Sequence, residues 1–292
     1  MKILVIDIGG TAVKMGLSNL DGTMNLMEEF PTESEKGGPY VIQKIIDYIE
    51  KIHVNFDTIS ICTTGQVDEE TGSIIYANEN MPNYTNTELK AIFEKKFGVV
   101  VKVENDVNAA ALGERNFGVG QNYDHFLCLT YGTGVGGAMI INSKIYHGQN
   151  GVAGEYGHMI LYPNGRPCNC GKKGCYEQYA STTALVNEAL KLNKKYTNGK
   201  VILQYIEKDL ELKHTFHQWI LNISYGLVSL IHIFNPPLII LGGGIMEQEN
   251  IVKMIQIEVN KQIMKSFSNV RIVGASLGNK AGMLGALSLI KD

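Results

Sequence analysis

The sequence has few residues of the kinds that would point to a nucleic-acid, secreted or membrane protein. Its 292 residues include one tryptophan, five cysteines and seven prolines, and 29 acidic residues stand against 26 basic ones. The net charge of −3 gives no electrostatic reason to expect nucleic acid or an anionic membrane as a partner. The most apolar long stretch, residues 220–246, is interrupted by Pro236-Pro237. This predicts a core helix followed by a buried strand, and no transmembrane span.

Several familiar signatures are also missing. The P-loop sequence G-x-x-x-x-G-K-[ST] occurs nowhere, which excludes that class of nucleotide-binding enzyme. Residues 132–137 match G-x-G-x-x-G, but a strand is expected after them, so no helix N-terminus is available for a dinucleotide. Asp7 interrupts the first apolar run, so no secretory signal is expected. A cytoplasmic location follows, with clustered cysteines as metal ligands instead of disulfides.

One short unit occurs twice in the chain. The apolar run 2–8 is followed by a glycine turn and a second strand, and the run 126–131 is followed by the glycines of 132–137. The first turn alone is equally compatible with a plain tight turn. The repetition favours a phosphate clamp, with Asp7 beside it near Mg²⁺.

This duplication predicts two related α/β lobes. We expect a small N-terminal lobe over residues 1–118 and a large lobe over 119–280. The helix predicted over 281–292 has small residues at Gly282 and Gly285, so it must pack closely, and we expect it on the first lobe.

The segment 151–177 carries a group of metal-ligand residue types. Cys168, Cys170 and Cys175 fall within eight residues, and His158 lies ten residues before the first. Thiolates and imidazole are the ligands of tetrahedral zinc, and four protein ligands leave no position for an activated water. One interpretation is a structural zinc site with no chemistry nearby. Our hypothesis is that the zinc shapes a loop from which Glu155, His158 and Glu177 face a substrate.

Asp106 stands between a predicted strand, 99–103, and a predicted helix that begins near Ala109. Asp and Asn at such a junction usually cap the helix, and this is the ordinary explanation. The alternative is a general base held rigidly at the mouth of a cleft. The polar loop 77–87 is rich in amides, which suit either a bound polyol or a solvated turn.

Three motifs together carry a resemblance: DIGGTAVK near the start, TYGTGVGGA in the middle, and GEYGH followed by CNCGKKGCYE. In this combination the chain resembles the ROK family of sugar kinases and repressors over nearly its whole length. The resemblance implies the actin-like ATPase (ribonuclease H-like) fold, in which two α/β lobes border a central cleft.

The resemblance also implies roles for particular residues. It assigns ATP binding to Asp7, Ile8, Gly9, Gly10, Thr11, Gly132, Thr133, Gly134, Val135, Gly136, Gly137, Gly243 and Gly244, with Asp7 near Mg²⁺. It assigns substrate contacts to Gly65, Asn80, Asn105, Asp106, Glu155, His158 and Glu177, and structural zinc to His158, Cys168, Cys170 and Cys175. Asp106 would be the catalytic base, and a homodimer is expected.

The subtype is open. Gln66 replaces a proline and Tyr84 a tryptophan that are common in the family, and both positions are expected near the sugar pocket. The stretch TTGQVDEETG looks like the family's β-glucoside kinases, which phosphorylate the 6-hydroxyl of disaccharides such as cellobiose. Glucose and N-acetylmannosamine remain alternatives. So do a sugar-sensing regulator and an actin-like ATPase, although the first motif begins at residue 7 and leaves no room for a preceding DNA-binding domain.

Overall fold

The structure is a computed structural model that describes residues 1–290. By its internal contacts the chain forms two compact units. Unit 1 comprises Met1–Gln121, Lys144–Ala153 and the C-terminal segment from Asn279; unit 2 comprises Asn122–Ser143 and Gly154–Gly278. The last two residues of the predicted C-terminal helix, 291–292, lie outside the described residues.

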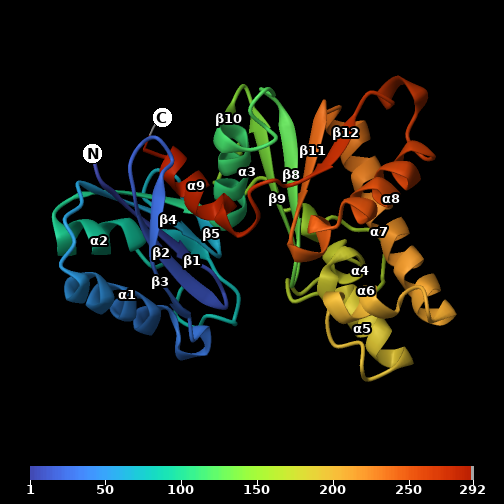
Figure 1. Ribbon diagram of the computed structural model, residues 1–292, viewed down its shortest axis with the longest axis horizontal. Helices are drawn as coiled ribbons and strands as arrows, with labels where there is room; N and C mark the ends of the chain where they lie inside the picture. Colours follow the sequence, from blue (N-terminus) through green and yellow to red (C-terminus); the bar gives the residue numbers. More distant parts are fainter. Residues whose placement is uncertain (291–292) are drawn as a thin grey trace. The chain divides into compact units, whose positions relative to one another are not determined.

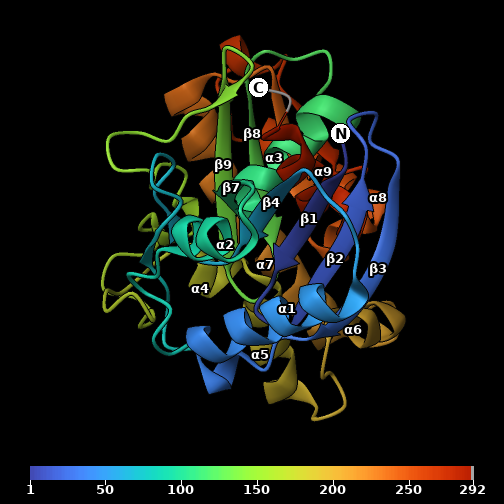
Figure 2. The ribbon, with the colours of Figure 1, turned by 90° about the vertical axis from the view of Figure 1, so that its left-hand side faces the viewer.

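Unit 1 is built on a five-stranded mixed sheet with the order β3-β2-β1-β4-β7 (Figure 2). The strands are β1 (Ile3–Ile8), β2 (Ala12–Ser18), β3 (Met24–Pro31), β4 (Thr58–Thr63) and β7 (Val100–Asn105). A two-stranded sheet, β5 (Gln66–Val67) and β6 (Ile74–Tyr76), follows β4. Because β1, β4 and β7 are parallel, their carboxyl ends meet at one edge, where Asp7 pairs with Cys62 and Cys62 with Glu104.

Helices cover both faces of this sheet (Figure 1). Leu4, Ile6 and Ile8 pack on the face of α1 (Gly38–Ile52) and α2 (Leu89–Phe97). Ile3 and Val5 pack on the opposite face, against α3 (Asp106–Phe117) and α9 (Ala281–Ser288). Side chains alternate along a strand, so Asp7 continues the face of Ile3 and Val5 at the end of β1.

Helices α3 and α9 approach each other through glycine. A Cβ atom added at Gly285 would lie 1.5 Å from the Ala109 carbonyl oxygen, and one at Gly113 would lie 2.4 Å from that of Ala281. No side chain fits at either point, so the two backbones are in direct contact. This confirms the expectation that the C-terminal helix packs closely through its small residues.

Unit 2 repeats the arrangement of hairpin and parallel strands. Within this unit the strands follow the order β9-β8-β11-β12. They are β8 (Phe126–Tyr131), β9 (Val135–Ile141), β11 (Leu238–Gly242) and β12 (Arg271–Gly274). The short strand β10 (Lys144–Ile145) lies in the segment that groups with unit 1. As β1 does with β2 and β4, β8 pairs antiparallel with β9 and parallel with β11. Thr130 is the penultimate residue of β8, as Asp7 is of β1, which confirms the predicted duplication.

The helices of unit 2 are α4 (Glu177–Ala180), α5 (Thr182–Leu192), α6 (Gly199–Tyr205), α7 (Leu210–Phe234) and α8 (Glu249–Asn260). The core of this unit joins Leu127 and Leu129 of β8 to the apolar face of α7. Asn235, in the left-handed conformation with φ of 44°, ends α7, and two prolines follow it. Within residues 1–290, no helix has both the length and the apolar character needed to cross a bilayer.

Candidate functional site

At the junction between β7 and α3, two adjacent residues have different roles in the structure. Asn105, not Asp106, is the N-cap: its Oδ1 accepts from the backbone N–H groups of Val107 (2.9 Å) and Asn108 (3.1 Å). Its Nδ2 donates to the carbonyl oxygen of Gly65 at 2.9 Å. Asn105 therefore uses its amide to cap α3 and to hold the turn after β4.

Asp106 is the first residue of α3. Its Oδ1 accepts from the backbone N–H of Val107 (2.9 Å) and from Asn105 Nδ2 (3.1 Å). The residue is largely withdrawn from solvent but retains some accessible surface. That burial, followed by the negative charge of Asp7, raises the pKa of Asp106 to about 7. A carboxyl group with a pKa near neutrality is suited to accept a proton as a general base.

Asp7 lies on the same sheet edge. Burial raises its pKa, while the positive charge of Lys14 and a hydrogen bond from the Cys62 thiol oppose that rise. A Cβ at Gly282, at the start of α9, would lie 3.6 Å from Asp7 Oδ2. The negative charge of Asp7 acts on Asp106, so the two carboxyl groups, one on β1 and one at the start of α3, influence each other's ionisation. Carboxyl groups with perturbed pKa values are typical of functional sites.

The turn after β1 is open on its outer side. The Gly9 N–H donates to the Ala12 carbonyl oxygen at 3.1 Å, and the Thr11 carbonyl accepts from the Thr32 N–H at 2.9 Å. Gly10 and Thr11 are exposed, and a Cβ at Gly10 would meet nothing within 4 Å. Ile8 is fully buried, so only its backbone could contribute to a ligand site.

The remaining predicted substrate residues of unit 1 differ in environment. Gly65 has φ of +96°, and a Cβ there would lie 2.9 Å from the Tyr76 carbonyl oxygen, so glycine is required. Asn80 is exposed in the amide-rich loop, and its N–H donates to Asn78 Oδ1 at 3.0 Å. Tyr84 is fully buried with its hydroxyl 2.7 Å from Thr63 Oγ1. In this structure it supports the end of β4 and presents no surface to a ligand.

A neighbouring cluster was missed in the sequence. The buried carboxylate of Glu104 lies between the backbone of Asn105 and the ring of His147, and Glu69 contacts the other side of that ring. Glu104 stands two residues before the predicted base, and this closeness in the sequence was the one signal available. His147 lies 43 residues further along the chain, and no spacing rule connects it to the site.

In unit 2, the turn 132–137 is shaped by close backbone approaches. The Gly132 N–H donates to the Gly134 carbonyl oxygen at 3.0 Å. A Cβ at Gly134 would lie 2.5 Å from Glu177 Oε2, and one at Gly137 would lie 2.3 Å from the Gly154 carbonyl oxygen. Between them, Thr133 is exposed and Val135 is buried, and Gly136 is partly exposed. The turn therefore presents backbone at its surface, next to the carboxylate of Glu177.

Gly243 and Gly244 follow β11 and have distinct roles. Gly243 has φ of +103°, and a Cβ there would lie 2.3 Å from the Tyr131 carbonyl oxygen. At Gly244 a Cβ would meet nothing within 4 Å. The first glycine is required by the fold, and the second leaves open space where a ligand could approach the backbone.

His158, Cys168, Cys170 and Cys175 converge as predicted. Their ligand atoms all lie within 4.8 Å of one another. Cys170 and Cys175 Sγ are 3.6 Å apart, and Cys168 Sγ is 3.8 Å from His158 Nδ1. Two sulfur ligands of a tetrahedral zinc lie about 3.8 Å apart, so this donor set fits zinc. His158 Nε2 lies 3.8 Å from Glu155 Oε2, and a carboxylate near the second ring nitrogen is usual for a metal-binding histidine.

The two predicted carboxylates border this cluster. Glu177, the first residue of α4, places Oε1 3.1 Å from Cys168 Sγ and Oε2 beside Gly134. Glu155 precedes the short helix that carries His158, and both are exposed. Unit 2 therefore brings Glu155, His158 and Glu177 together around the four zinc-type ligands.

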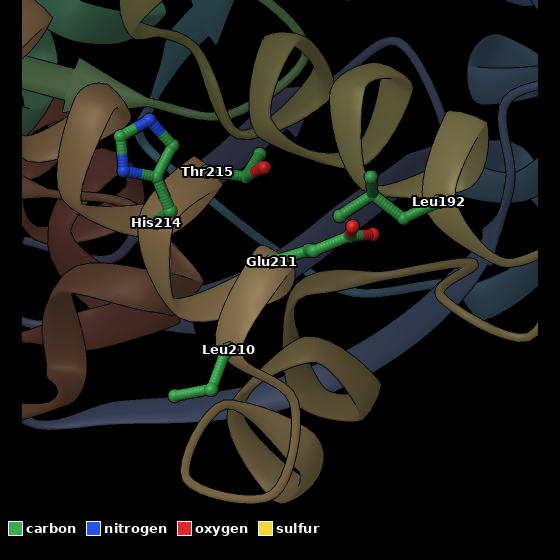
Figure 3. Close-up of a pocket in the computed structure, with 5 residues that line it drawn as sticks. All are labelled: Leu192, Leu210, Glu211, His214 and Thr215. Atoms are coloured by element: carbon green, nitrogen blue, oxygen red, sulfur yellow. The ribbon is translucent and has the colours of Figure 1, made fainter.

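A separate pocket lies in unit 2 between the end of α5 and the start of α7 (Figure 3). Its lining residues are Leu192, Leu210, Glu211, His214 and Thr215. None of them is among the predicted site residues, and the lining offers a single carboxylate without a cation or a glycine turn. It lacks the groups that phosphate binding requires.

Several known proteins are similar to this chain over nearly its whole length. A Thermotoga maritima glucokinase is 33% identical over 100% of this chain and 98% of its own length. A Listeria monocytogenes beta-glucoside kinase is 32% identical over 98% and 96%. The Bacillus subtilis xylose repressor is 31% identical over 98% of this chain, but over only 76% of the repressor.

Among solved structures, a ROK family glucokinase from Streptomyces griseus, in complex with glucose and AMPPNP, superposes with a TM-score of 0.84. It is 30% identical, and 99% of each chain is covered. This similarity confirms the predicted α/β, actin-like fold. The sequence also matches the ROK family over residues 3–292. The chain therefore belongs to the ROK family.

Proposed function

We propose that the protein is an ATP-dependent sugar kinase, with Asp106 as the catalytic base. The observation that carries the proposal is the environment of the Asp106 carboxyl group. Burial and the negative charge of Asp7 raise the pKa of this group to about 7. A structural cap would not need this environment, since Asn105 already caps α3. The similarity to glucokinases supports the same assignment.

In the proposed reaction, the Asp106 carboxylate accepts the proton of a sugar hydroxyl as that oxygen attacks the γ-phosphorus of ATP. The bond from this phosphorus to the β–γ bridging oxygen breaks, and ADP leaves with its electron pair. Asn105 holds Asp106 through Oδ1, and this leaves Oδ2 for the hydroxyl. We assign the phosphates to the backbone of the glycine turns, 9–11 and 132–137, with Gly243 and Gly244. Backbone donors held in place suit phosphoryl transfer, which depends on positioning and charge stabilisation. Mg²⁺, when bound near Asp7, would neutralise charge on the phosphates.

For the substrate, we propose the 6-hydroxyl of a β-glucoside such as cellobiose. The support is the stretch TTGQVDEETG together with the similarity to a beta-glucoside kinase. The proposed sugar contacts are Gly65, Asn80, Asn105, Glu155, His158 and Glu177. Glucose and N-acetylmannosamine are the alternatives within the same reaction.

The test is a panel of cellobiose, glucose and N-acetylmannosamine with MgATP, following ADP release. We expect cellobiose to have the highest kcat/KM and the Asp106→Asn protein to release almost no ADP with any sugar. Faster turnover of glucose would overturn the β-glucoside assignment alone. ADP release that no sugar stimulates would overturn the kinase assignment and favour a plain ATPase.

We also propose one structural zinc per chain on His158, Cys168, Cys170 and Cys175. Protein purified without chelator should contain about one zinc per chain by metal analysis. The Cys170→Ser protein should lose it, while Cys128→Ser, a change of a core cysteine in the same unit, should retain it. Zinc-free wild-type protein of unchanged activity and melting temperature would contradict the assignment.

A sugar-sensing regulator is the second candidate, because the xylose repressor is 31% identical over 98% of this chain. A regulator would bind sugar without rapid phosphorylation. Turnover of at least about 1 per second, the low end for enzymes, would favour the kinase. We further propose a cytoplasmic homodimer, in line with the family resemblance.

A further inference from the structure

The cluster of Glu69, Glu104 and His147 in unit 1 has no part in the chemistry proposed above. His147 Nε2 lies 2.7 Å from Glu104 Oε2, and Nδ1 lies 2.6 Å from Glu69 Oε2. A neutral imidazole has one N–H, so only the imidazolium can donate to both carboxylates. The geometry is that of a cation held between two anions.

The two carboxylates differ in their exposure to solvent, and so in how much a neighbouring cation stabilises them. The side chain of Glu104 is 5% exposed, whereas that of Glu69 is 61% exposed. A buried carboxylate is costly unless it is paired, while an exposed one is solvated by water. His147 is therefore important chiefly as the counter-charge of Glu104.

Glu104 in turn holds the residues that precede and begin α3. Its Oε1 accepts from the Asn105 backbone N–H at 2.7 Å and from Asn108 Nδ2 at 3.0 Å. Asn105 then contacts Asp106 through Nδ2, 3.1 Å from Oδ1. A continuous series of contacts thus runs from the imidazole of His147 to the carboxyl group of Asp106.

The ring reaches this position from a distant part of the sequence. Residues 144–153 belong with unit 1, although both flanking segments belong to unit 2. Within this segment the Ala153 N–H donates to the His147 carbonyl oxygen at 3.0 Å. Gly148 and Gly151 have φ of 72° and 78°, and a Cβ at Gly151 would lie 2.8 Å from the Val67 carbonyl oxygen. The turns shape the segment, and the close approach of Gly151 to Val67 and the contacts of His147 attach it to the rest of unit 1.

We infer that His147 is a positioning residue, which through Glu104 holds the Asn105–Asp106 pair in the geometry for proton abstraction. The inference rests on the proposed role of Asp106. Replacing His147 by a neutral side chain would leave Glu104 buried without a counter-charge, and its carboxylate would move or take up a proton. The N–H of Asn105 would then lose its acceptor, and Asp106 its support.

The charge of the ring provides a specific signature. Burial lowers the pKa of His147, but the hydrogen bonds and charges of Glu104 and Glu69 together raise it above its ordinary value. Within the described residues, two charged groups contact the ring: Glu104, from β7, and Glu69, from the turn after β5. The contacts are complete below the ordinary pKa of about 6.5 and are lost as pH rises through the raised pKa.

The test compares His147→Gln with His147→Arg, which keeps a cation with several donors at every pH used. His214→Gln, a change of an exposed histidine in unit 2, is the matched control. We expect His147→Gln to lower kcat about 10- to 100-fold, as a misplaced reacting group does, with KM for MgATP within about twofold. His147→Arg should recover most of kcat and keep it at alkaline pH, where wild-type turnover declines.

A second measurement does not depend on activity. An NMR titration of the histidine rings, assigned by the signal missing in His147→Gln, should give a pKa for His147 above the ordinary histidine value of about 6.5. A His147→Gln protein with wild-type kcat, or an arginine variant as impaired as the glutamine one, would overturn the inference. So would a His147 ring that titrates below the ordinary histidine pKa of about 6.5. If the wild type phosphorylated no sugar, the proposed function would fail, while this titration would still decide whether the ring is the charged partner of Glu104.

Discussion

The two sheets share a topology but differ at the edge where their parallel strands end. In unit 1 that edge carries Asp7, Cys62 and Glu104 in register across β1, β4 and β7. In unit 2 the matching positions on β8 and β11 are Thr130 and Gly242. The same backbone thus presents carboxyl groups in one unit and small residues in the other.

Both units carry a glycine turn, but the side chains at the two edges differ in chemistry. Carboxyl groups at the edge of unit 1 can accept a proton or lie beside a cation. Small residues and glycine turns at the edge of unit 2 allow the backbone to approach an anion.

The largest effect on turnover should come from the edge of the unit 1 sheet that carries carboxyl groups. Asp106→Asn removes the proposed base while its amide preserves the hydrogen bond from Val107. We expect kcat to fall by about 10²–10⁴-fold, since a positioned base contributes that much. The affinity for sugar, measured by calorimetry, should stay within about threefold. Such a change is well below the roughly 1.4 kcal/mol of binding free energy that corresponds to tenfold. Near-normal turnover in this variant would point to another base.

The same substitution should make the protein more stable. Because the pKa of Asp106 in the folded state is about 7, above its ordinary value of 3.8, the folded state binds more protons than the unfolded state between these values. The free energy of unfolding should therefore fall as pH rises from about 4 to 7, by about 2–4 kcal/mol for this group.

Asp106→Asn should remove that part of the pH dependence and raise the free energy of unfolding at about pH 8 by a similar amount. Urea unfolding of both proteins at acid and alkaline pH measures it. As a control, Asp209→Asn changes a partly exposed helix cap of unit 2, where the folded pKa is lowered, so its pH dependence has the opposite sign. Equal stability of wild type and Asp106→Asn at every pH would mean that the carboxyl group is not in the environment described.

The glycine edge of unit 2 can be tested with two adjacent residues. Gly243→Ala places a side chain at a left-handed φ and against the Tyr131 carbonyl, and we expect a loss of about 2 kcal/mol or more in unfolding free energy. Gly244→Ala enters open space and should change stability by less than about 0.5 kcal/mol. It should weaken MgATP binding instead, because the nucleotide would meet the new methyl group. Unchanged nucleotide affinity in Gly244→Ala would remove Gly244 from the ATP site.

The smallest effect concerns the buried tyrosines that support each edge. Tyr84 contacts Thr63 in unit 1, and Tyr131 contacts Tyr176 at 2.9 Å in unit 2. Removing either hydroxyl, as Tyr84→Phe or Tyr131→Phe, should cost about 1 kcal/mol of unfolding free energy. Because Tyr84 is fully buried, KM for sugar should stay within about twofold in Tyr84→Phe. A large change in KM would show that this tyrosine reaches the sugar.

Sequence reasoning worked best where the residues of a feature are close together along the chain. The four zinc-type ligands span 158–175, and turns between them bring their ligand atoms within 4.8 Å. The duplicated hairpins were recognisable for the same reason, since strand, glycine turn and strand are consecutive. Local spacing is enough when a few φ and ψ angles determine where the side chains meet.

At the start of α3 the sequence left two readings open. Asn105 and Asp106 are both good capping residues, and spacing does not say which one caps. Only the backbone of the folded chain shows that Asn105 is the cap, with φ of −64° and ψ of 148°. Tyr84 is a second case: its position in the sequence suggested a pocket, and packing placed it in the core.

The sequence alone determined the repeated strand–turn unit, the zinc-type ligand set and the segment that carries the proposed base, because each depends on neighbours in the chain. The tertiary structure decided that Asp106 is largely withdrawn from solvent and acted on by Asp7, that α3 and α9 touch through glycine, and that His147 pairs with Glu104. These pairs join residues dozens to hundreds of positions apart. Their contacts depend on burial and on the register of parallel strands, which no local pattern encodes.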